Sequence, residues 1–424
     1  MNKILKNIKL IKKVKLLLFP FYNEPEIKKI FQIFEKDQTK NKRVAMFVGG
    51  CVRRYILGEE IDDIDIATIF TPNEIKKKFS DTDIKVVETG IEHGTVTLIL
   101  KNKKFEITTL RKDIITDGRH AEVSFTDDWQ LDSERRDFTF NAIYLDRKGK
   151  IYDPQLGLSD LKRGIVKFIG DPNKRIEEDY LRIIRFIRFT LYYDHKNFEK
   201  STLEAIKLNL NGVNNISKER IFSELSKMLK MKNFINLSKK KDLQNIFFLI
   251  FPEFKYFSRL EKLEEISKLI EINEEIILGT MLIDKTDNNE YFCHKYKVSN
   301  NLKENLDFLK NSVEKANADK NFFKKNLKKN IYFFGKKKLK KINTIFFLIN
   351  KNITYKEYTK FIESINKTTI PSFPYDGKYL ISKGLNEGKK IGQVIKELEK
   401  SWIENNYELA DSLANEIISK AKQN

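Results

Sequence analysis

The fold is decided by the stretch Phe47-Val48-Gly49-Gly50-Cys51-Val52-Arg53-Arg54, in which an apolar segment runs into two glycines and then into a helical pattern. Glycine at both positions lets the backbone turn tightly and approach a ligand, and the start of a helix favours an anion. A glycine pair after a strand is also common in ordinary turns. The stretch therefore predicts a strand, a tight turn and a helix, and an anion site is one interpretation of the turn.

A pair of aspartates lies on the next predicted strand, in Asp63-Ile64-Asp65. Their carboxylates project from one face, because side chains at positions i and i+2 of a strand lie on the same side. Two ionised carboxylates repel each other, and a divalent cation such as Mg²⁺, which also binds substrate phosphates, relieves that repulsion. Glu106, in another alternating segment, is a candidate third carboxylate. The alternatives are a solvated acidic strand end and an ordinary surface glutamate.

Arginine is the rarer cation in this chain. Of 80 Lys and Arg residues only 15 are Arg, and residues 260–424 contain none. Because lysine is the default cation, we expect arginine mainly where a rigid two-pronged donor must bind phosphate or carboxylate. Catalysis is therefore expected within the first 260 residues.

Two arginine-containing stretches suit a nucleotide. Residues 135–142, Arg-Arg-Asp-Phe-Thr-Phe-Asn-Ala, offer donors for phosphates and sugar. In residues 177–188 an aspartate and three arginines recur three positions apart, which predicts that they share one helix face. They form either ion pairs or a donor and acceptor set that matches the polar edge of a base. These four are Asp179, Arg182, Arg185 and Arg188.

In this order the motifs resemble those of the class II tRNA nucleotidyltransferases, the family of CCA-adding enzymes and bacterial poly(A) polymerases in the polymerase beta superfamily. The resemblance covers about residues 44–230. It comprises Gly-Gly-x-Val-Arg, Asp-x-Asp, Arg-Arg-Asp, Asp-x-x-x-Gly-x-x-Asp-Leu and Glu-Asp-x-x-Arg. Residues 216–221 resemble the helix-stabilising element that follows. One position departs from the pattern, because the family usually has Asp where Arg54 stands.

The resemblance implies template-independent nucleotidyl transfer to a tRNA 3′ end. Asp63 and Asp65 would hold two Mg²⁺ ions that activate the 3′ hydroxyl, with Glu106 as a further catalytic carboxylate. The base, C or A, would be read by hydrogen bonds from Asp179 and Arg182, with Arg185 and Arg188 in support. The triphosphate and ribose would be contacted by Gly49, Gly50, Arg53, Arg136, Asp137 and Asn141. Residues 111–129 would correspond to the family's flexible loop.

Within the family, the sequence leaves several alternatives open for what the enzyme adds. Full CCA addition from CTP and ATP is the first expectation, because residues 84–96 look like the CCA-adding form and lack the Gly-Arg-Arg-Phe-type signature of poly(A) polymerases. CC-adding and A-adding enzymes share the motifs, and a bacterial poly(A) polymerase is a further alternative. An inactive RNA-binding relative is the alternative from another class, and the intact aspartate pair argues against it.

Composition agrees with a folded protein that binds nucleic acid. The chain is 41% hydrophobic and 33% charged, which is incompatible with disorder, and its net charge of +20 favours a polyanionic partner. A general lysine bias accounts for part of this charge. Cys51 and Cys293 exclude a disulfide framework, and the longest apolar run near the N-terminus, residues 16–20, is too short to span a bilayer. We expect a cytoplasmic protein that binds tRNA, CTP and ATP but no membrane; its oligomeric state stays open.

The predicted fold class is α+β, a polymerase-beta-like head followed by helices. Short β-branched runs separated by turns occupy the first part of the chain, and helical periodicity takes over from residue 173. The expected divisions are an N-terminal segment (1–22), a catalytic head (23–171), a base-reading neck (172–235), a body (236–310) and a tRNA-binding tail (311–424).

Overall fold

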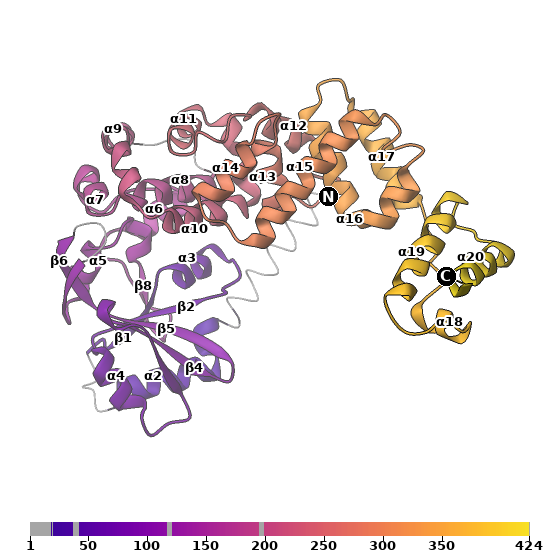
Figure 1. Cartoon of the computed structure of the whole chain (residues 1–424). Coiled ribbons are helices and arrows are strands. Elements are labelled where there is room, and N and C mark those ends of the chain that lie inside the picture. Colours follow the sequence, from indigo (N-terminus) through magenta and orange to yellow (C-terminus); the bar gives the residue numbers. More distant parts are fainter. Residues whose placement is uncertain (1–17, 19, 37–41, 117–120, 195–198, 424) are drawn as a thin grey trace. The chain divides into compact units, whose positions relative to one another are not determined.

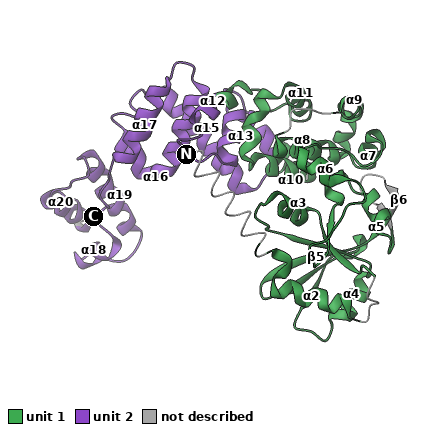
Figure 2. Cartoon of the chain, turned by 180° about the vertical axis from the view of Figure 1, so that it is seen from behind, with its two compact units in different colours: residues 1–261, 295–297 green, residues 262–294, 298–424 purple. Residues whose placement is uncertain are grey.

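The computed structural model of the chain describes residues 18, 20–36, 42–116, 121–194 and 199–423 (Figure 1). It divides into two compact units. Unit 1 comprises residues 1–261 and 295–297, and unit 2 comprises residues 262–294 and 298–424 (Figure 2). The predicted α+β class is confirmed, since a sheet lies in the first part of unit 1 and the described residues that follow it are helical.

Among the described residues, seven strands form one sheet in the order β3-β4-β5-β2-β1-β8-β9. They are β1 (Ala45–Val48), β2 (Ile64–Thr68), β3 (Lys85–Gly90), β4 (Thr95–Leu100), β5 (Lys103–Thr109), β8 (Tyr144–Leu145) and β9 (Ile151–Tyr152). Strands β2 and β5 run parallel, and the other neighbouring pairs run antiparallel. A separate two-stranded sheet is formed by β6 (Arg111–Thr116) and β7 (Ala121–Phe125). The segment expected to be a flexible loop thus contains regular β-structure, and its residues 117–120 lie outside the described part of the chain.

Both faces of the central sheet are covered by apolar side chains. On one face the Phe47 ring lies 4.8 Å from that of Phe31 in α2 (Pro25–Glu35). On the other face Met46 and Val48 pack in a cluster with Trp129 of α5 (Trp129–Glu134). A slip of one residue between β1 and β2 would exchange the two faces, so this packing fixes their register.

The Asp-x-x-x-Gly-x-x-Asp-Leu motif joins the sheet to the helices. Asp153 accepts hydrogen bonds from the amides of Gly157 and Leu158, at 2.8 and 2.9 Å, and so begins α6 (Gly157–Arg163). A Cβ at Gly157 would lie 2.1 Å from the carbonyl oxygen of Thr139, in the short 3₁₀ helix η3 (Thr139–Ala142). Asp160 accepts a 2.8 Å hydrogen bond from the Thr139 hydroxyl. The motif therefore holds α6 tightly against η3.

The remaining helices account for most of the chain. In the first part of unit 1 they are η1 (Phe21–Asn23), α3 (Gly50–Leu57), α4 (Pro72–Phe79) and η2 (Ile91–His93). From residue 172 onward they are α7 (Pro172–Glu178), α8 (Leu181–Tyr193), α9 (Lys200–Asn209), η4 (Leu210–Asn215), α10 (Lys218–Leu229), η5 (Lys232–Lys239), α11 (Lys241–Ile250), α12 (Ser258–Ile266), α13 (Glu274–Leu282), α14 (Asn288–Lys295), α15 (Asn300–Ala318), α16 (Leu327–Ile349), α17 (Tyr355–Lys367), α18 (Gly377–Ser382), α19 (Lys389–Glu404) and α20 (Asp411–Gln423). Of the helices that the structure describes, none has both the length and the apolar composition of a membrane span.

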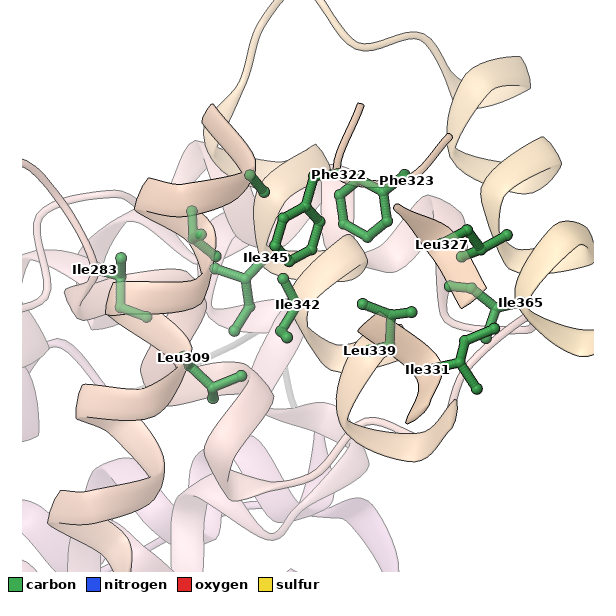
Figure 3. Packing of buried hydrophobic residues seen from close by; sticks show 12 residues of the cluster. Ile283, Leu309, Phe322, Phe323, Leu327, Ile331, Leu339, Ile342, Ile345 and Ile365 are labelled. Carbon is green, nitrogen blue, oxygen red and sulfur yellow. The ribbon is translucent and has the colours of Figure 1, made fainter. Parts of the chain in front are cut away.

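Unit 2 is held together by apolar clusters. Phe323, Leu327 and Ile331, which recur at helical spacing, are buried together with Ile342 and Ile345 (Figure 3). A separate cluster joins α18, α19 and α20 through Leu380, Leu398 and Ile418, among others. The first cluster is formed by residues before 371, and the second includes Tyr375 within residues 371–378, the break expected from the Pro and Gly residues there.

Candidate active site

The sheet brings three carboxylates close enough to influence one another. Asp63 stands just before β2, and Asp65 is aligned with Glu106 across the parallel β2–β5 pair. Burial raises the pKa of Asp65, and the negative charge of Asp63 raises it further, against the opposing effects of Arg136 and Arg53. Burial also raises the pKa of Glu106, and the negative charges of Asp65 and Asp63 add to this effect. Negative charge thus accumulates on this face, as strand periodicity predicts.

The chemistry of these donors fits a divalent cation. Anionic oxygen ligands are those that Mg²⁺ and similar hard cations prefer, and a cation would offset the repulsion that raises the pKa of Asp65. Within the described residues, no group of three or more His, Cys, Asp or Glu side chains is arranged to hold a metal ion. The assignment of Asp63 and Asp65 as metal ligands stays a prediction, as does the role of the neighbouring carboxylate of Glu106.

The glycine turn lies directly against Asp65. Gly49 has φ 74° and ψ −127°, a conformation that residues with a side chain rarely adopt, and a Cβ there would lie 3.3 Å from Asp65 Oδ2. The amide of Gly50, the first residue of α3, donates a hydrogen bond to Asp65. The predicted strand, turn and helix are confirmed, and both glycines contact the central carboxylate through close backbone approach.

Arg53, Asn141 and Asp137 form one hydrogen-bonded series. The Arg53 guanidinium donates to Asn141 Oδ1 and lies 4.9 Å from the centre of the Phe189 ring. The Asn141 amide in turn donates to Asp137 Oδ1 at 2.6 Å. Asp137 Oδ2 accepts from Arg185 at 2.6 Å. Asp137 and Asn141 are both buried, so in this structure they orient the two arginines.

Arg136 is held by a carboxylate that the sequence analysis missed. Asp132 is fully buried in α5, and its Oδ2 accepts from Arg136 Nη2 at 3.1 Å and from the Tyr144 hydroxyl at 2.7 Å. Its Oδ1 accepts from Arg135 at 2.7 Å. Burial alone would raise the pKa of Asp132, but Arg136, Arg135 and the Tyr144 hydroxyl hold it well below its usual range. The spacing of three and four residues to the two arginines was a signal for this pair.

Replacing Asp132 by Asn is expected to destabilise the protein by about 3 kcal/mol, because two guanidinium groups lose their buried carboxylate. The matched change Asp127→Asn, at an exposed ion pair with Lys42, should alter stability by less than about 0.5 kcal/mol. Urea unfolding at pH 7 measures both. Equal effects of the two changes would contradict the role given to Asp132.

The Asp132 carboxylate also makes the free energy of unfolding depend on pH in the acid range. Because the folded-state pKa of Asp132 is depressed, its contribution is complete above the unfolded-state value of about 4 and is lost as the pH falls below it. Between about pH 4 and pH 2.5 the free energy of unfolding should therefore fall less steeply in Asp132→Asn than in the wild type.

The prediction that Asp179 shares one helix face with Arg182, Arg185 and Arg188 is wrong for Asp179. Asp179 lies between α7 and α8 with φ −155°, so it is not helical and does not stack on Arg182. Its Oδ1 accepts from the Leu181 amide at 3.1 Å, and its Oδ2 accepts from Arg220 of α10 at 2.8 Å. The backbone leaves the helix at Asp179, where its side chain bonds to a backbone amide.

Arg182 is buried and makes three hydrogen bonds within the chain. Its Nη1 donates to Glu178 Oε2 at 2.6 Å and to the Arg175 carbonyl at 2.7 Å, and its Nη2 donates to the Arg135 carbonyl at 3.2 Å. A guanidinium has five N–H donors, so Nε–H and one Nη2–H are not used by these bonds. Glu178, one residue before the predicted aspartate, is therefore the carboxylate partner of Arg182.

The last two arginines of the row share a buried glutamate of α10. Glu224 is 3% exposed, and its Oε2 accepts from Arg188 at 2.6 Å. Arg185 lies 3.8 Å from the other oxygen of Glu224, and it also binds Asp137. Arg185 thus connects the 135–142 segment to α10, and Arg188 binds α10 beside it; their predicted support of base recognition stays a prediction.

Arg54, the departure from the family pattern, points to a surface pair. Its guanidinium binds the carboxylate of Asp62 and lies 3.4 Å from the Glu60 carbonyl. Asp62 is 69% exposed, so this pair contributes less than about 1 kcal/mol to stability. Arg54 therefore fastens the segment that leads into Asp63, without reaching the carboxylates themselves.

Comparison with known protein families supports the interpretation of these motifs. Residues 45–167 match the "Poly A polymerase head domain", and residues 197–257 match the "Probable RNA and SrmB-binding site of polymerase A". The first match contains the predicted catalytic carboxylates and the residues predicted to contact triphosphate and ribose.

Curated relatives match over most of the chain. The mitochondrial CCA tRNA nucleotidyltransferase 1 of Danio rerio is 32% identical over 92% of this chain and 89% of its own length, and that of Homo sapiens is 33% identical over 90% and 87%. The CCA-adding enzyme of Ligilactobacillus salivarius is 34% identical over 89% and 92%.

Solved structures share the fold. The CCA-adding enzyme of Bacillus stearothermophilus in complex with CTP has a TM-score of 0.65 and 20% identity over 94% of this chain and 98% of its own. That of Thermotoga maritima complexed with tRNA has a TM-score of 0.64 and 22% identity over 96% and 98%. The chain belongs to the family of CCA tRNA nucleotidyltransferases, the CCA-adding enzymes, as its relatives show and its motifs and fold agree.

Proposed function

We propose that this protein adds CCA to the 3′ ends of tRNA from CTP and ATP without a nucleic-acid template. One observation carries the proposal: Asp65 lies where the negative charge of Asp63 and the positive charges of Arg53 and Arg136 all act on its carboxylate. A triphosphate needs cationic donors, and the transferred phosphoryl group needs a metal-binding carboxylate beside them. This site offers both.

Family members use divalent metals, and we propose Mg²⁺ as the ion held by Asp63 and Asp65. When bound, the ion supplies positive charge to the α-phosphate and makes the tRNA 3′ hydroxyl more acidic. Arg53 and Arg136 bind and orient the triphosphate. The buried Asp137 and Asp132 hold these donors in place, Asp137 through Asn141 and Asp132 directly.

Base recognition is proposed for Asp179 and Arg182. Cytosine and adenine both present an amino donor beside a ring-nitrogen acceptor on the Watson–Crick edge, whereas uracil and guanine present a carbonyl beside an N–H. A carboxylate acceptor beside a guanidinium donor complements the first pair. The carboxylate of Asp179 has further acceptor capacity beyond its two observed hydrogen bonds, and Arg182 has two N–H groups that its three bonds do not use.

Gly49→Ala is expected to lower nucleotide incorporation by about 100-fold, because its Cβ would displace Asp65. Gly170→Ala is the matched control, since Gly170 has a similar φ of 76° but has no atom within 4 Å of an added Cβ. Both changes should lower stability through backbone strain, because φ is positive at both positions. Equal activities of the two purified variants would show that the Cβ contact with Asp65 has no consequence.

The location and finer organisation of the chain stay predictions. A cytoplasmic protein is still our expectation from its two cysteines, which are both free and buried, although curated relatives include mitochondrial enzymes. The division into neck, body and tail is likewise a proposal, in which the tail supports the tRNA and the neck carries the base-reading residues.

Separate nucleotides test the proposed function. With CTP alone, the enzyme should add two residues to tRNA that ends at the discriminator base. With ATP alone, it should add one residue to tRNA that already ends in CC and none to tRNA that lacks both C residues. An enzyme that extends tRNA with ATP alone into a long tail is a poly(A) polymerase, and one that never incorporates A is CC-adding.

A further inference from the structure

Unit 2 contains a pocket of about 410 Å³ that none of the predicted catalytic or nucleotide-binding residues lines. One wall is formed by the segment between α12 and α13 and the start of α13. The opposite wall is formed by α16. The lining residues are Leu269, Ile270, Glu271, Asn273 and Ile276 on the first wall and Lys336, Lys337, Lys340, Lys341 and Thr344 on the second. The volume suits a ligand of the size of one nucleotide.

The α16 wall carries a strong excess of positive charge. Residues 327–349 contain seven lysines and no acidic residue. Of the four pocket lysines, Lys341 is paired with Glu275, and Lys336 donates to the Asn366 carbonyl at 2.8 Å. Within the part of the chain that the structure describes, Lys337 and Lys340 form no ion pair. A concave surface with unneutralised lysines attracts a compact anion.

The backbone of α16 adds to this preference. Gly335 has φ 73° and ψ 156°, so the helix is interrupted there and a new helical segment starts at Lys336. Lysines at the start of a helix are disfavoured, because the N-terminal end of the helix dipole is positive and repels their charge. A bound anion would offset this repulsion. The space beside Gly335 is free of other protein atoms, because an added Cβ there would meet none within 4 Å.

The rest of the lining indicates what the anion is attached to. Leu269, Ile270 and Ile276 present apolar surface beside the lysines, which a sugar or base could cover but inorganic phosphate could not. The carboxylate of Glu271 is an acceptor for a ribose hydroxyl. Lysine is a compact point charge suited to phosphate. These features together describe a phosphate ester on a ribose.

We propose that this pocket is a second phosphate-ester site, which binds a nucleotide unit through Lys337 and Lys340. The ester belongs either to the backbone of the tRNA substrate or to a free nucleotide, and both share the chemistry that the pocket recognises. The version in which the ester belongs to the tRNA backbone rests on the proposed function. Binding at the pocket is measured without catalysis, so that the two hypotheses fail separately.

The test compares wild type with Lys337→Gln/Lys340→Gln, which keeps most of each side chain and removes two charges. Lys28→Gln/Lys77→Gln is the control, because both lysines are exposed on helices of unit 1 and the same charge is lost. Thermal unfolding of all three proteins confirms that they are folded. One arm measures the affinity for tRNA lacking CCA at several salt concentrations, and the other measures ATP stoichiometry by calorimetry.

We expect the pocket variant to bind tRNA about 5- to 10-fold more weakly than the control, with a salt slope lower by about 1. A wild type that binds two ATP molecules, beside a pocket variant that binds one and keeps its tRNA affinity, would instead assign the site to free nucleotide. If the pocket variant matches the control in both arms, the proposal is wrong. CCA addition by wild type is assayed separately, so a protein that binds as predicted but adds no CCA overturns only the proposed function.

Discussion

Asp65→Asn is expected to reduce nucleotide incorporation by about 10³-fold or more while tRNA affinity changes less than about twofold. The change removes one negative charge and keeps the size of the side chain, so it weakens metal binding without creating a cavity. The Asp65 carboxylate is partly buried, and the charges of Asp63, Arg53 and Arg136 all act on it, so we expect its loss to affect the centre of the site directly. Single-turnover incorporation with saturating CTP and tRNA measures the chemical step, and filter binding measures tRNA affinity.

Asp62→Asn is the matched control for this prediction. Asp62 lies one residue before Asp63, but its carboxylate is exposed and paired with Arg54. Its replacement should change incorporation by less than about threefold. An Asp65→Asn enzyme that stays within tenfold of the wild-type rate would exclude Asp65 as a metal ligand, and equal losses in both variants would indicate a general effect of charge.

Arg182→Lys is expected to lose the preference for CTP and ATP over UTP and GTP, as well as rate. Lysine can keep an ion pair with Glu178, but it cannot supply the several N–H donors in fixed directions that the guanidinium provides. Because Asp179 and Arg182 match the edge that C and A share, we expect the discrimination of CTP against UTP, and of ATP against GTP, to fall by about 10- to 100-fold. The measurement is kcat/KM for each nucleotide on tRNA that ends at the discriminator base and on tRNA that ends in CC.

Two further variants separate recognition from folding. Arg147→Lys, at an exposed pair with Glu35, controls for the exchange of arginine for lysine and should leave selectivity unchanged. Arg182→Ala should lose selectivity too, but it leaves Glu178 and two carbonyls without their donor, so its stability must be measured beside it. A slow Arg182→Lys enzyme that still rejects UTP and GTP as strongly as the wild type would refute base reading by this residue.

Much of the head could be predicted because strand periodicity determines which side chains share a face. The alternation around Ile64 and Ile66 predicted that Asp63 and Asp65 share a face. The sequence offered Glu106 only as a candidate third carboxylate, and its alignment with Asp65 across the parallel β2–β5 pair comes from the structure. Strands β8 and β9 have two residues each, which is too short for any periodic pattern to reveal.

Partners that come together only in the fold could not be predicted. Glu224 is an acidic residue on a helix and looks like a surface residue in sequence, yet it is buried against Arg185 and Arg188 of another helix. Asp132 differs, because its arginines lie three and four residues along the chain and only its burial was hidden in the sequence. The prediction for Asp179 failed because no Gly or Pro marks the end of α7. The one available signal was the preference of Asp for helix starts, where its side chain bonds a free amide.

The most direct test of the account is the number and order of nucleotides that the purified wild type adds to tRNA ending at the discriminator base, with CTP, ATP and Mg²⁺ all present. Sequencing of the product is expected to find C, C and A, after which addition stops. A product that ends after two C residues, or one that carries a long run of A, would contradict it.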